Sequence, residues 1–296
     1  MSSSKINSKK FKVKENEKIS LKDFDPGFCG EFENKKQAEK QLEQDIQELS
    51  ELQYQLYAEN KQSLLVVFQA MDAAGKDGAI KHVFSGVNPQ GCSVHSFKKP
   101  SANELEHDFF WRHYKALPQR GEIGIFNRSH YENVLITKVH PEFILGENLP
   151  HISSVNDIDK DFWTDRYKQI NNFEKIISKN GTTVIKFFLH LSKEEQKLRF
   201  LERIENTDKN WKFSAADIAE RTYWDSYQKV YAEAISNTST EYAPWYIIPA
   251  DNKWFSRVAI GSIVVETLKN MNIKMPVLSE KETATLADIK LKLLKD

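Results

Sequence analysis

The chain has 296 residues, of which 40% are hydrophobic and 28% charged, and its 42 Lys and Arg residues are balanced by 42 Asp and Glu residues. This length allows one large α/β domain or two small ones, with enough chain to bury a sizeable core. The zero net charge excludes a generally basic protein, so any site for a polyanion must come from local clustering of Lys and Arg.

The cysteines and the N-terminal segment indicate the cellular compartment in which the protein is expected. Cys29 and Cys92 do not stand in a metal-ligand spacing, which fits a reducing compartment. The polar, lysine-rich start MSSSKINSKKFKVKENEK has no apolar run behind it, so we expect no signal peptide, and disorder over residues 1–18. The longest apolar runs, such as SLLVVF, are too short to span a membrane. We therefore expect a cytoplasmic protein without a membrane partner.

Helical and strand patterns alternate along the chain. In chain order they predict helix 34–60, strand 63–72, helix 76–87, strand 91–97, helix 101–118, strand 120–130, helix 161–181, strand 182–191, helix 193–206, helix 214–237, strand 243–251 and helix 252–271. The strands are short runs rich in Val, Ile and Leu, as is typical of buried parallel strands. The alternation predicts the α/β class, with one parallel sheet sandwiched between helices in a single domain.

The segment between the first strand and the next helix, AMDAAGKDG, is close to a phosphate-binding loop. The pattern G-x-x-x-x-G-K-[ST] is met at Gly75 and Lys76, whereas Ala70 replaces the first glycine and Asp77 the hydroxyl residue. Such a loop works because the free N–H groups at a helix N-terminus point at an anion. The expected phosphate-binding residues of the loop and helix are Ala73, Ala74, Gly75, Lys76, Asp77, Gly78 and Lys81.

Two carboxylates flank this Gly-Lys pair. Asp72 stands at the end of the strand, where it can hold Mg²⁺ or Mn²⁺ directly or through water, because carboxylates are suitable ligands for hard cations. Asp77 is either a second metal ligand or an acid in the first helical turn that the helix dipole stabilises. We predict a metal site at Asp72.

The third strand ends in a polar cluster, Asn127-Arg128-Ser129. Arg128 can pair with phosphate oxygens through two parallel hydrogen bonds. An amide at position 127 can orient a phosphate or a metal-bound water but adds no charge. The alternative is a strand-end turn whose arginine faces solvent.

A polar segment, NTDKNWKFS over residues 206–214, separates two predicted helices. It is either a solvated loop or part of a mobile lid. The lid interpretation, over about residues 199–222, rests on basic residues in and around the segment: Arg199, Arg203, Lys209, Lys212 and Arg221.

Four segments together resemble the second family of polyphosphate kinases: FQAMDAAGKDGAIKHVFSGVNPQG, FNRSHYENVL, DRYKQINNFEKII and FLHLSKEEQKLRFLERIENTDKNWKFSAADIAER. The resemblance covers roughly residues 20–275. It implies a P-loop kinase fold like that of thymidylate kinases, with a helical lid, and phosphoryl transfer between inorganic polyphosphate and a nucleotide. It also implies roles for Asp72 at the metal, for Lys76 and Arg128 at the transferring phosphate, and for Arg203 in the lid.

The resemblance further suggests which substrates and partners to expect. Many members have aspartate where this chain has Asn127, and the form FNRSHYE is similar to the subgroup that accepts both nucleoside mono- and diphosphates. The partners implied are polyphosphate, AMP and ADP, with no nucleic acid, and a homotetramer or homodimer. Two alternatives remain, namely an ATP-dependent nucleoside monophosphate kinase of the same fold and a P-loop module that binds nucleotide without turnover.

Overall fold

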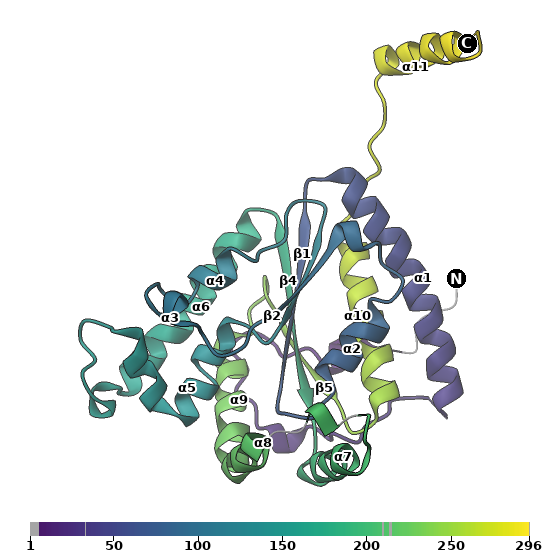
Figure 1. The fold of residues 1–296 in the computed structure, drawn as a ribbon. Helices are drawn as coiled ribbons and strands as arrows, with labels where there is room; N and C mark the ends of the chain where they lie inside the picture. The colour runs from purple at the N-terminus through teal and green to yellow at the C-terminus, as the bar shows by residue number, and fades with distance from the viewer. Residues whose placement is uncertain (1–5, 33, 209, 213–214, 296) are drawn as a thin grey trace.

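The computed structural model describes residues 6–32, 34–208, 210–212 and 215–295. Within them the chain forms a five-stranded parallel sheet between two layers of helices, with the strands in the order β2-β3-β1-β4-β5 (Figure 1). The strands are β1 (Ser63–Ala70), β2 (Cys92–Ser96), β3 (Ile123–Asn127), β4 (Thr182–His190) and β5 (Trp245–Pro249). The predicted fold class, a parallel sheet sandwiched between helices, is confirmed.

The α-helices are α1 (Lys35–Glu59), α2 (Lys76–Val83), α3 (Ala102–Leu105), α4 (Trp111–Tyr114), α5 (Ile136–Val139), α6 (Lys160–Lys179), α7 (Lys193–Glu205), α8 (Ala215–Glu220), α9 (Trp224–Thr238), α10 (Lys253–Asn270) and α11 (Glu280–Leu293). On one face of the sheet, α1, α2 and α10 contribute to one hydrophobic core, and on the other face α6 and α9 contribute to a second (Figure 1). Every residue of β1 is buried because both faces of this central strand are covered.

The N-terminal segment packs against the sheet, which corrects the expected disorder of residues 1–18. The N–H of Val13 donates to the Trp245 carbonyl, and the N–H of Ile247 donates to the Phe11 carbonyl, both at 2.9 Å. The side chains of Phe11 and Val13 are 5% and 2% exposed. The segment therefore covers the outer edge of β5, which would otherwise leave backbone groups unpaired. Residues 1–5 lie outside the described part of the chain.

Several predicted helices are shorter than their patterns indicated. The segment 101–118 forms two short helices, α3 and α4, because the Asp108 carboxylate accepts a hydrogen bond from the N–H of Phe110 between them. The predicted helix 76–87 ends at Val83, and 214–237 divides into α8, a 3₁₀ turn (Arg221–Tyr223) and α9.

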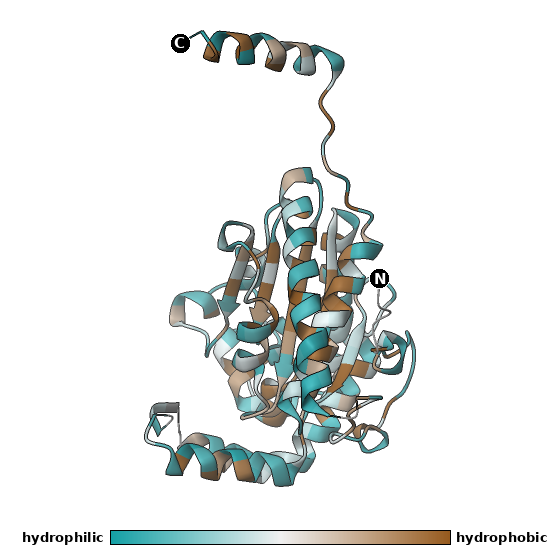
Figure 2. Cartoon of the chain, turned by 90° about the vertical axis from the view of Figure 1, so that its right-hand side faces the viewer, coloured by the Kyte–Doolittle hydropathy of each residue, from teal (hydrophilic) through white to brown (hydrophobic). Residues whose placement is uncertain are grey.

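A further helix, α11, was not expected, and its residues are exposed. Figures 1 and 2 show it standing away from the body at the end of an extended segment. None of the helices in the described ranges is long and apolar enough to cross a membrane.

Candidate active site

The phosphate-binding loop joins β1 to α2 at the carboxyl end of the sheet. Gly75 has φ of +100° and precedes the first helical residue, a backbone conformation that glycine adopts without a steric penalty. Ala73 also has a positive φ, of 62°. The chain thus turns sharply after the strand, and α2 begins with its free N–H groups at the turn, as an anion site requires.

Lys76 is the first residue of α2, and its side chain folds back over the loop. Its ammonium group is buried and donates to the Ala70 carbonyl at 2.9 Å. Burial lowers the pKa of Lys76, and the negative charge of Asp72 opposes this effect. The lysine therefore lies between the end of β1 and the carboxylate of Asp72.

Arg128 and Asp72 meet across two neighbouring strand ends. Arg128 follows β3, and its guanidinium contacts the Asp72 carboxylate at 3.3 Å. A third charged residue, Glu132, is close to both: although burial opposes the charged form of the arginine, Glu132 and Asp72 raise the pKa of Arg128. Burial raises the pKa of Glu132, and Arg128 and Lys76 counteract it. Sequence reasoning missed Glu132, although it is the last residue of the quoted motif NRSHYE.

The side chain of Asn127 contacts the segment that forms the phosphate-binding loop and the start of α2. Its side-chain amide donates to the Asp77 carboxylate at 2.8 Å and so links the end of β3 to the first turn of α2. Two other predicted phosphate-binding residues, Gly78 and Lys81, lie further along α2, and Lys81 is exposed. Of the residues predicted to bind phosphate, Arg128 lines the cavity that opens beside Asp72, whereas the others do not: Ala73, Ala74, Gly75, Lys76, Asp77, Gly78, Lys81 and Arg203.

A cavity of about 550 Å³ opens beside Asp72 and Arg128. Its walls differ in chemistry. Acidic and basic side chains stand at the loop end, namely Asp72, Arg128, Glu132 and Asp217, and further basic residues, Lys98, Lys99 and Arg112, line another part. Leu105, Ile136 and Phe143 form an apolar part. Such a combination suits a ligand with a charged end and an aromatic or apolar end.

The predicted lid region extends from α7 through a 3₁₀ turn (Asn210–Lys212) and α8. Arg203, on α7, forms an ion pair with Asp217 of α8 at 3.6 Å, and Asp217 lines the cavity although Arg203 does not. Within the lid interval, residue 209 and residues 213–214 lie outside the described residues. Arg199, expected among the lid residues, is buried against the phosphate-binding loop.

The site can supply part of a magnesium shell. Within the described residues, no three His, Cys, Asp or Glu side chains gather closely enough to hold a metal ion by themselves. Mg²⁺ usually takes only one or two protein carboxylates, with substrate phosphates and water completing its octahedron. The Asp72 carboxyl, about a third exposed at the cavity wall, fits this requirement.

The sequence pattern of the polyphosphate kinase 2 family matches residues 32–276. The chain belongs to this family. It is 47% identical over 291 residues to the ADP-polyphosphate phosphotransferase of Rhodopseudomonas palustris, covering 98% of this chain and all of that protein. It is 44% identical over 281 residues to the AMP/ADP-polyphosphate phosphotransferase of Meiothermus ruber, covering 94% of this chain and 97% of the other.

A solved structure has the same architecture. The crystal structure of polyphosphate kinase 2 from Arthrobacter aurescens TC1 superimposes with a TM-score of 0.82 at 37% identity, over 91% of this chain and 93% of the other. The family assignment therefore agrees at the levels of sequence and fold.

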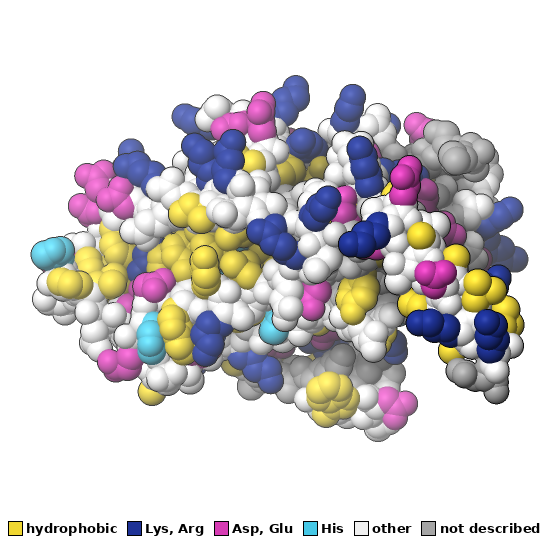
Figure 3. All heavy atoms as spheres, turned by 90° about the horizontal axis from the view of Figure 1, so that it is seen from above, with side chains coloured by type: hydrophobic (Ala, Val, Ile, Leu, Met, Phe, Trp, Pro, Cys, Tyr) yellow, Lys and Arg dark blue, Asp and Glu magenta, His cyan; other side chains and the backbone are white. Residues whose placement is uncertain are grey.

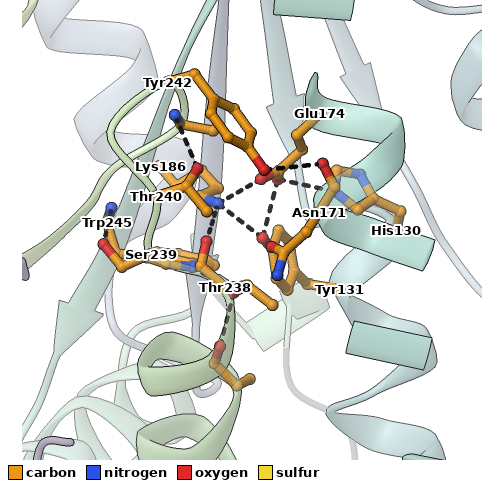
Figure 4. A network of polar contacts seen from close by, with 12 residues as sticks. His130, Tyr131, Asn171, Glu174, Lys186, Thr238, Ser239, Thr240, Tyr242 and Trp245 are labelled. Atoms are coloured by element: carbon orange, nitrogen blue, oxygen red, sulfur yellow. Dashed lines mark hydrogen bonds and ion pairs between the residues drawn. The ribbon is translucent and has the colours of Figure 1, made fainter. Parts of the chain in front are cut away.

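In this polyphosphate kinase 2 family member, the motif NRSHYE is supported from behind by a buried polar network (Figure 4). The Lys186 ammonium, on β4, donates to the Tyr131 hydroxyl at 2.8 Å and to the Glu174 carboxylate at 2.5 Å. His130 contacts the same carboxylate at 3.2 Å. Burial lowers the pKa of Lys186 to about 8 although Glu174 raises it. His130 and Tyr131 lie between Arg128 and Glu132 in the sequence. The network therefore holds in place the segment that carries these two charged residues of the site.

Proposed function

We propose that the protein transfers a phosphoryl group between inorganic polyphosphate and AMP or ADP. The observation that carries the proposal is the meeting of Asp72, at the start of the phosphate-binding loop, with Arg128 at one end of a cavity large enough for a nucleotide. The names of the relatives, an ADP- and an AMP/ADP-polyphosphate phosphotransferase, support this choice of substrates.

The chain's own residues have distinct tasks in this reaction. In-line transfer of a phosphoryl group depends on positioning and on neutralising charge rather than on a covalent intermediate. The loop amides and Lys76 would hold the donor phosphates, and Arg128 would pair with the oxygens of the transferring group. The apolar part of the cavity, with Leu105 and Phe143, would receive the base. Arg203 would reach the phosphates from the lid after leaving Asp217.

Mg²⁺ or Mn²⁺, held by Asp72 together with substrate phosphates, would supply charge neutralisation at the transferring group. Asp72→Asn keeps the shape of the side chain and removes the charge that holds a hard cation. We expect this variant to need a higher Mg²⁺ concentration for half-maximal activity. A metal titration identical to that of the wild type would show that Asp72 has only a structural role.

The deciding experiment omits ATP. The protein is incubated with AMP or ADP, Mg²⁺ and polyphosphate, and new nucleotide phosphate is measured. A parallel reaction contains ATP and AMP without polyphosphate. Formation of ADP or ATP in the first reaction supports the proposal. Turnover only in the second would identify an ATP-dependent nucleoside monophosphate kinase, and nucleotide binding without any turnover would identify a binding module.

As the subunit arrangement, we propose a homotetramer or a homodimer, which rests on the family resemblance alone. Light scattering of the purified protein would test it, and a monomer would contradict it.

A further inference from the structure

One face of α7 packs directly on the phosphate-binding loop. Gln196 and Arg199, three residues apart on this helix, are 2% and 4% exposed. The Gln196 amide donates to the Asp72 carbonyl at 3.0 Å. The Arg199 guanidinium donates to the carbonyls of Ala73 and Ala74 at 3.1 and 2.9 Å. Three consecutive carbonyls of the loop are therefore held by one helix.

The guanidinium of Arg199 has no donor left for a ligand. Its Nη2 donates to the carbonyls of Ala250 and Asp251, at the end of β5, at 2.6 and 2.9 Å. Its Nε donates to the Glu195 carboxylate at 2.8 Å. Together with the two bonds to the loop, these account for all five N–H donors that an arginine has. A phosphate could bind Arg199 only by displacing one of these bonds.

Holding the carbonyls also sets the direction of the amides. In a planar trans peptide, the C=O of one residue and the N–H of the next point to opposite sides. Because the carbonyls of Asp72 and Ala74 face α7, the N–H groups of Ala73 and Gly75 face away from it. Neither N–H group donates to another residue in the described part of the chain. These amides are thus presented to an anion on the other side of the loop.

We propose that Arg199, assisted by Gln196, is a positioning residue that fixes the direction of the loop amides and does not itself contact the phosphates. The proposal rests on the proposed function, since it assigns the donor polyphosphate to those amides. It separates two arginines of α7. Among the described residues, Arg203 has a single ion pair, at 3.6 Å, and could exchange it for a substrate, whereas all N–H donors of Arg199 are used within the protein.

The first test uses the wild-type protein and needs no catalysis. Tripolyphosphate is titrated into ¹⁵N-labelled protein without nucleotide, and the backbone amide resonances and the Arg199 Nε–H resonance are followed. We expect the amides of Ala73 and Gly75 to shift on binding, while the Arg199 resonance stays in place. A large shift of the Arg199 resonance would show direct contact with phosphate and would overturn the proposal.

The second test compares Arg199→Lys with a matched control. Lysine keeps the charge but has three donors, which cannot hold carbonyls on both sides of the site. We expect kcat to fall by about 10- to 100-fold, because small displacements of positioning groups have effects of this order. The KM for polyphosphate should rise, and the KM for AMP or ADP should stay within about twofold. The control Arg120→Met removes an arginine that donates to the Lys61 carbonyl at 2.7 Å on the exposed surface, and it should keep wild-type rates.

A third variant allows a test even if Arg199→Lys does not fold. Gln196→Met releases the Asp72 carbonyl and loses the hydrogen bond that Gln196 accepts from Arg221 at 2.8 Å, but it leaves every bond of Arg199 in place, so it should change the same constants in the same direction by a smaller factor. Unchanged constants in a folded Arg199→Lys or Gln196→Met protein would overturn the proposal and leave the proposed function intact. A wild-type protein that neither binds tripolyphosphate nor phosphorylates a nucleotide would overturn both.

Discussion

Two non-glycine residues of the site, Ala73 and Arg128, have left-handed backbone angles, with φ of 62° and 63°. Each such conformation costs about 1–3 kcal/mol and persists only where surrounding contacts hold it. At Arg128 the contact is a hydrogen bond from its N–H to the Phe68 carbonyl on β1, at 3.0 Å. The turn after β3 is therefore tied to the strand that leads into the phosphate-binding loop, so Arg128 and Asp72 keep their relative position.

Lys76 gives the sharpest prediction at the level of a single residue. We expect Lys76→Ala to lose about 10²- to 10³-fold in kcat, the effect typical of removing one preorganised group from a developing charge. The fold should survive, because the variant also removes a buried ammonium group. Steady-state rates and circular dichroism would measure both effects. Lys168→Ala, at an exposed lysine paired with Asp165, is the control. Near-normal turnover of a folded Lys76→Ala protein would refute the role of the loop.

Asn127 gives a second prediction, which concerns acceptor choice. Asn127→Asp replaces the donor to Asp77 with a second carboxylate, so the two side chains repel each other or attract a cation. We expect phosphorylation of AMP to fall more than that of ADP, because AMP brings less negative charge to the metal site. Rates with each acceptor at saturating polyphosphate would give the ratio.

A reversed pair serves as the control for this prediction. Asn127→Asp combined with Asp77→Asn restores one donor and one acceptor with their positions exchanged, and it should move the ratio back toward the wild type. An unchanged ratio in the single variant would place the choice of acceptor elsewhere, in the lid or the base pocket.

At the scale of elements, the strands and the loop could be predicted from the sequence because their signals are local. Asp72 and Lys76 follow a buried apolar run, and Asn127 and Arg128 follow another, so chain position alone brings them to one sheet edge. Arg199 could not be placed in this way. A charged residue on an amphipathic helix is normally solvated, and only the tertiary arrangement shows that carbonyls from two loops surround it.

The N-terminal segment was mispredicted for a related reason. Its composition is polar, and its few apolar residues, among them Phe11 and Val13, show no periodic pattern. These residues are buried because their segment pairs with β5, which lies more than 200 residues later in the chain. Contacts of this range leave no local signal.

The buried network behind NRSHYE supports a prediction about stability. Lys186→Met leaves the Glu174 carboxylate buried without its cation, and breaking a buried pair in this way costs about 3–5 kcal/mol. The double variant Lys186→Met/Glu174→Met leaves no buried charge at this position, so we expect it to be more stable than the sum of the two single effects by about 1–3 kcal/mol. Urea unfolding of the four proteins would measure the coupling. Strictly additive effects would show that the pair is not coupled.

At the scale of the whole molecule, one face illustrates how charge of both signs is distributed. On the face at the amino ends of the strands, away from the phosphate-binding loop, Lys and Arg side chains are interspersed with Asp and Glu around a hydrophobic area (Figure 3). A chain with zero net charge can attract a polyanion only through a local group of cations. For polyphosphate we expect this group to include Lys76, Lys81, Arg128 and Arg203.

This expectation can be tested with salt. Cations that neutralise a polyanion release its counterions, so affinity falls steeply as salt rises. We expect the Kd for polyphosphate to increase by about tenfold or more between roughly 50 and 200 mM salt. Affinity for adenosine, which carries no phosphate, should hardly change and serves as the control. A polyphosphate Kd that does not change with salt would mean that these cations do not bind the polyanion.

The strand order has a consequence for the time course of synthesis. β1 lies in the middle of the sheet, yet the hydroxyls of Ser63 on β1 and Thr182 on β4, which meet at 3.0 Å, are 119 residues apart. At roughly 5–20 residues per second, a ribosome needs about 6–24 s to add that stretch. During this interval β1, buried throughout in the finished protein, still has an unpaired, apolar edge. Nascent chains halted before residue 182 should therefore bind chaperones and be cut readily by protease, whereas chains with β4 outside the ribosomal tunnel should resist, and equal sensitivity of the two would contradict late closure of the sheet.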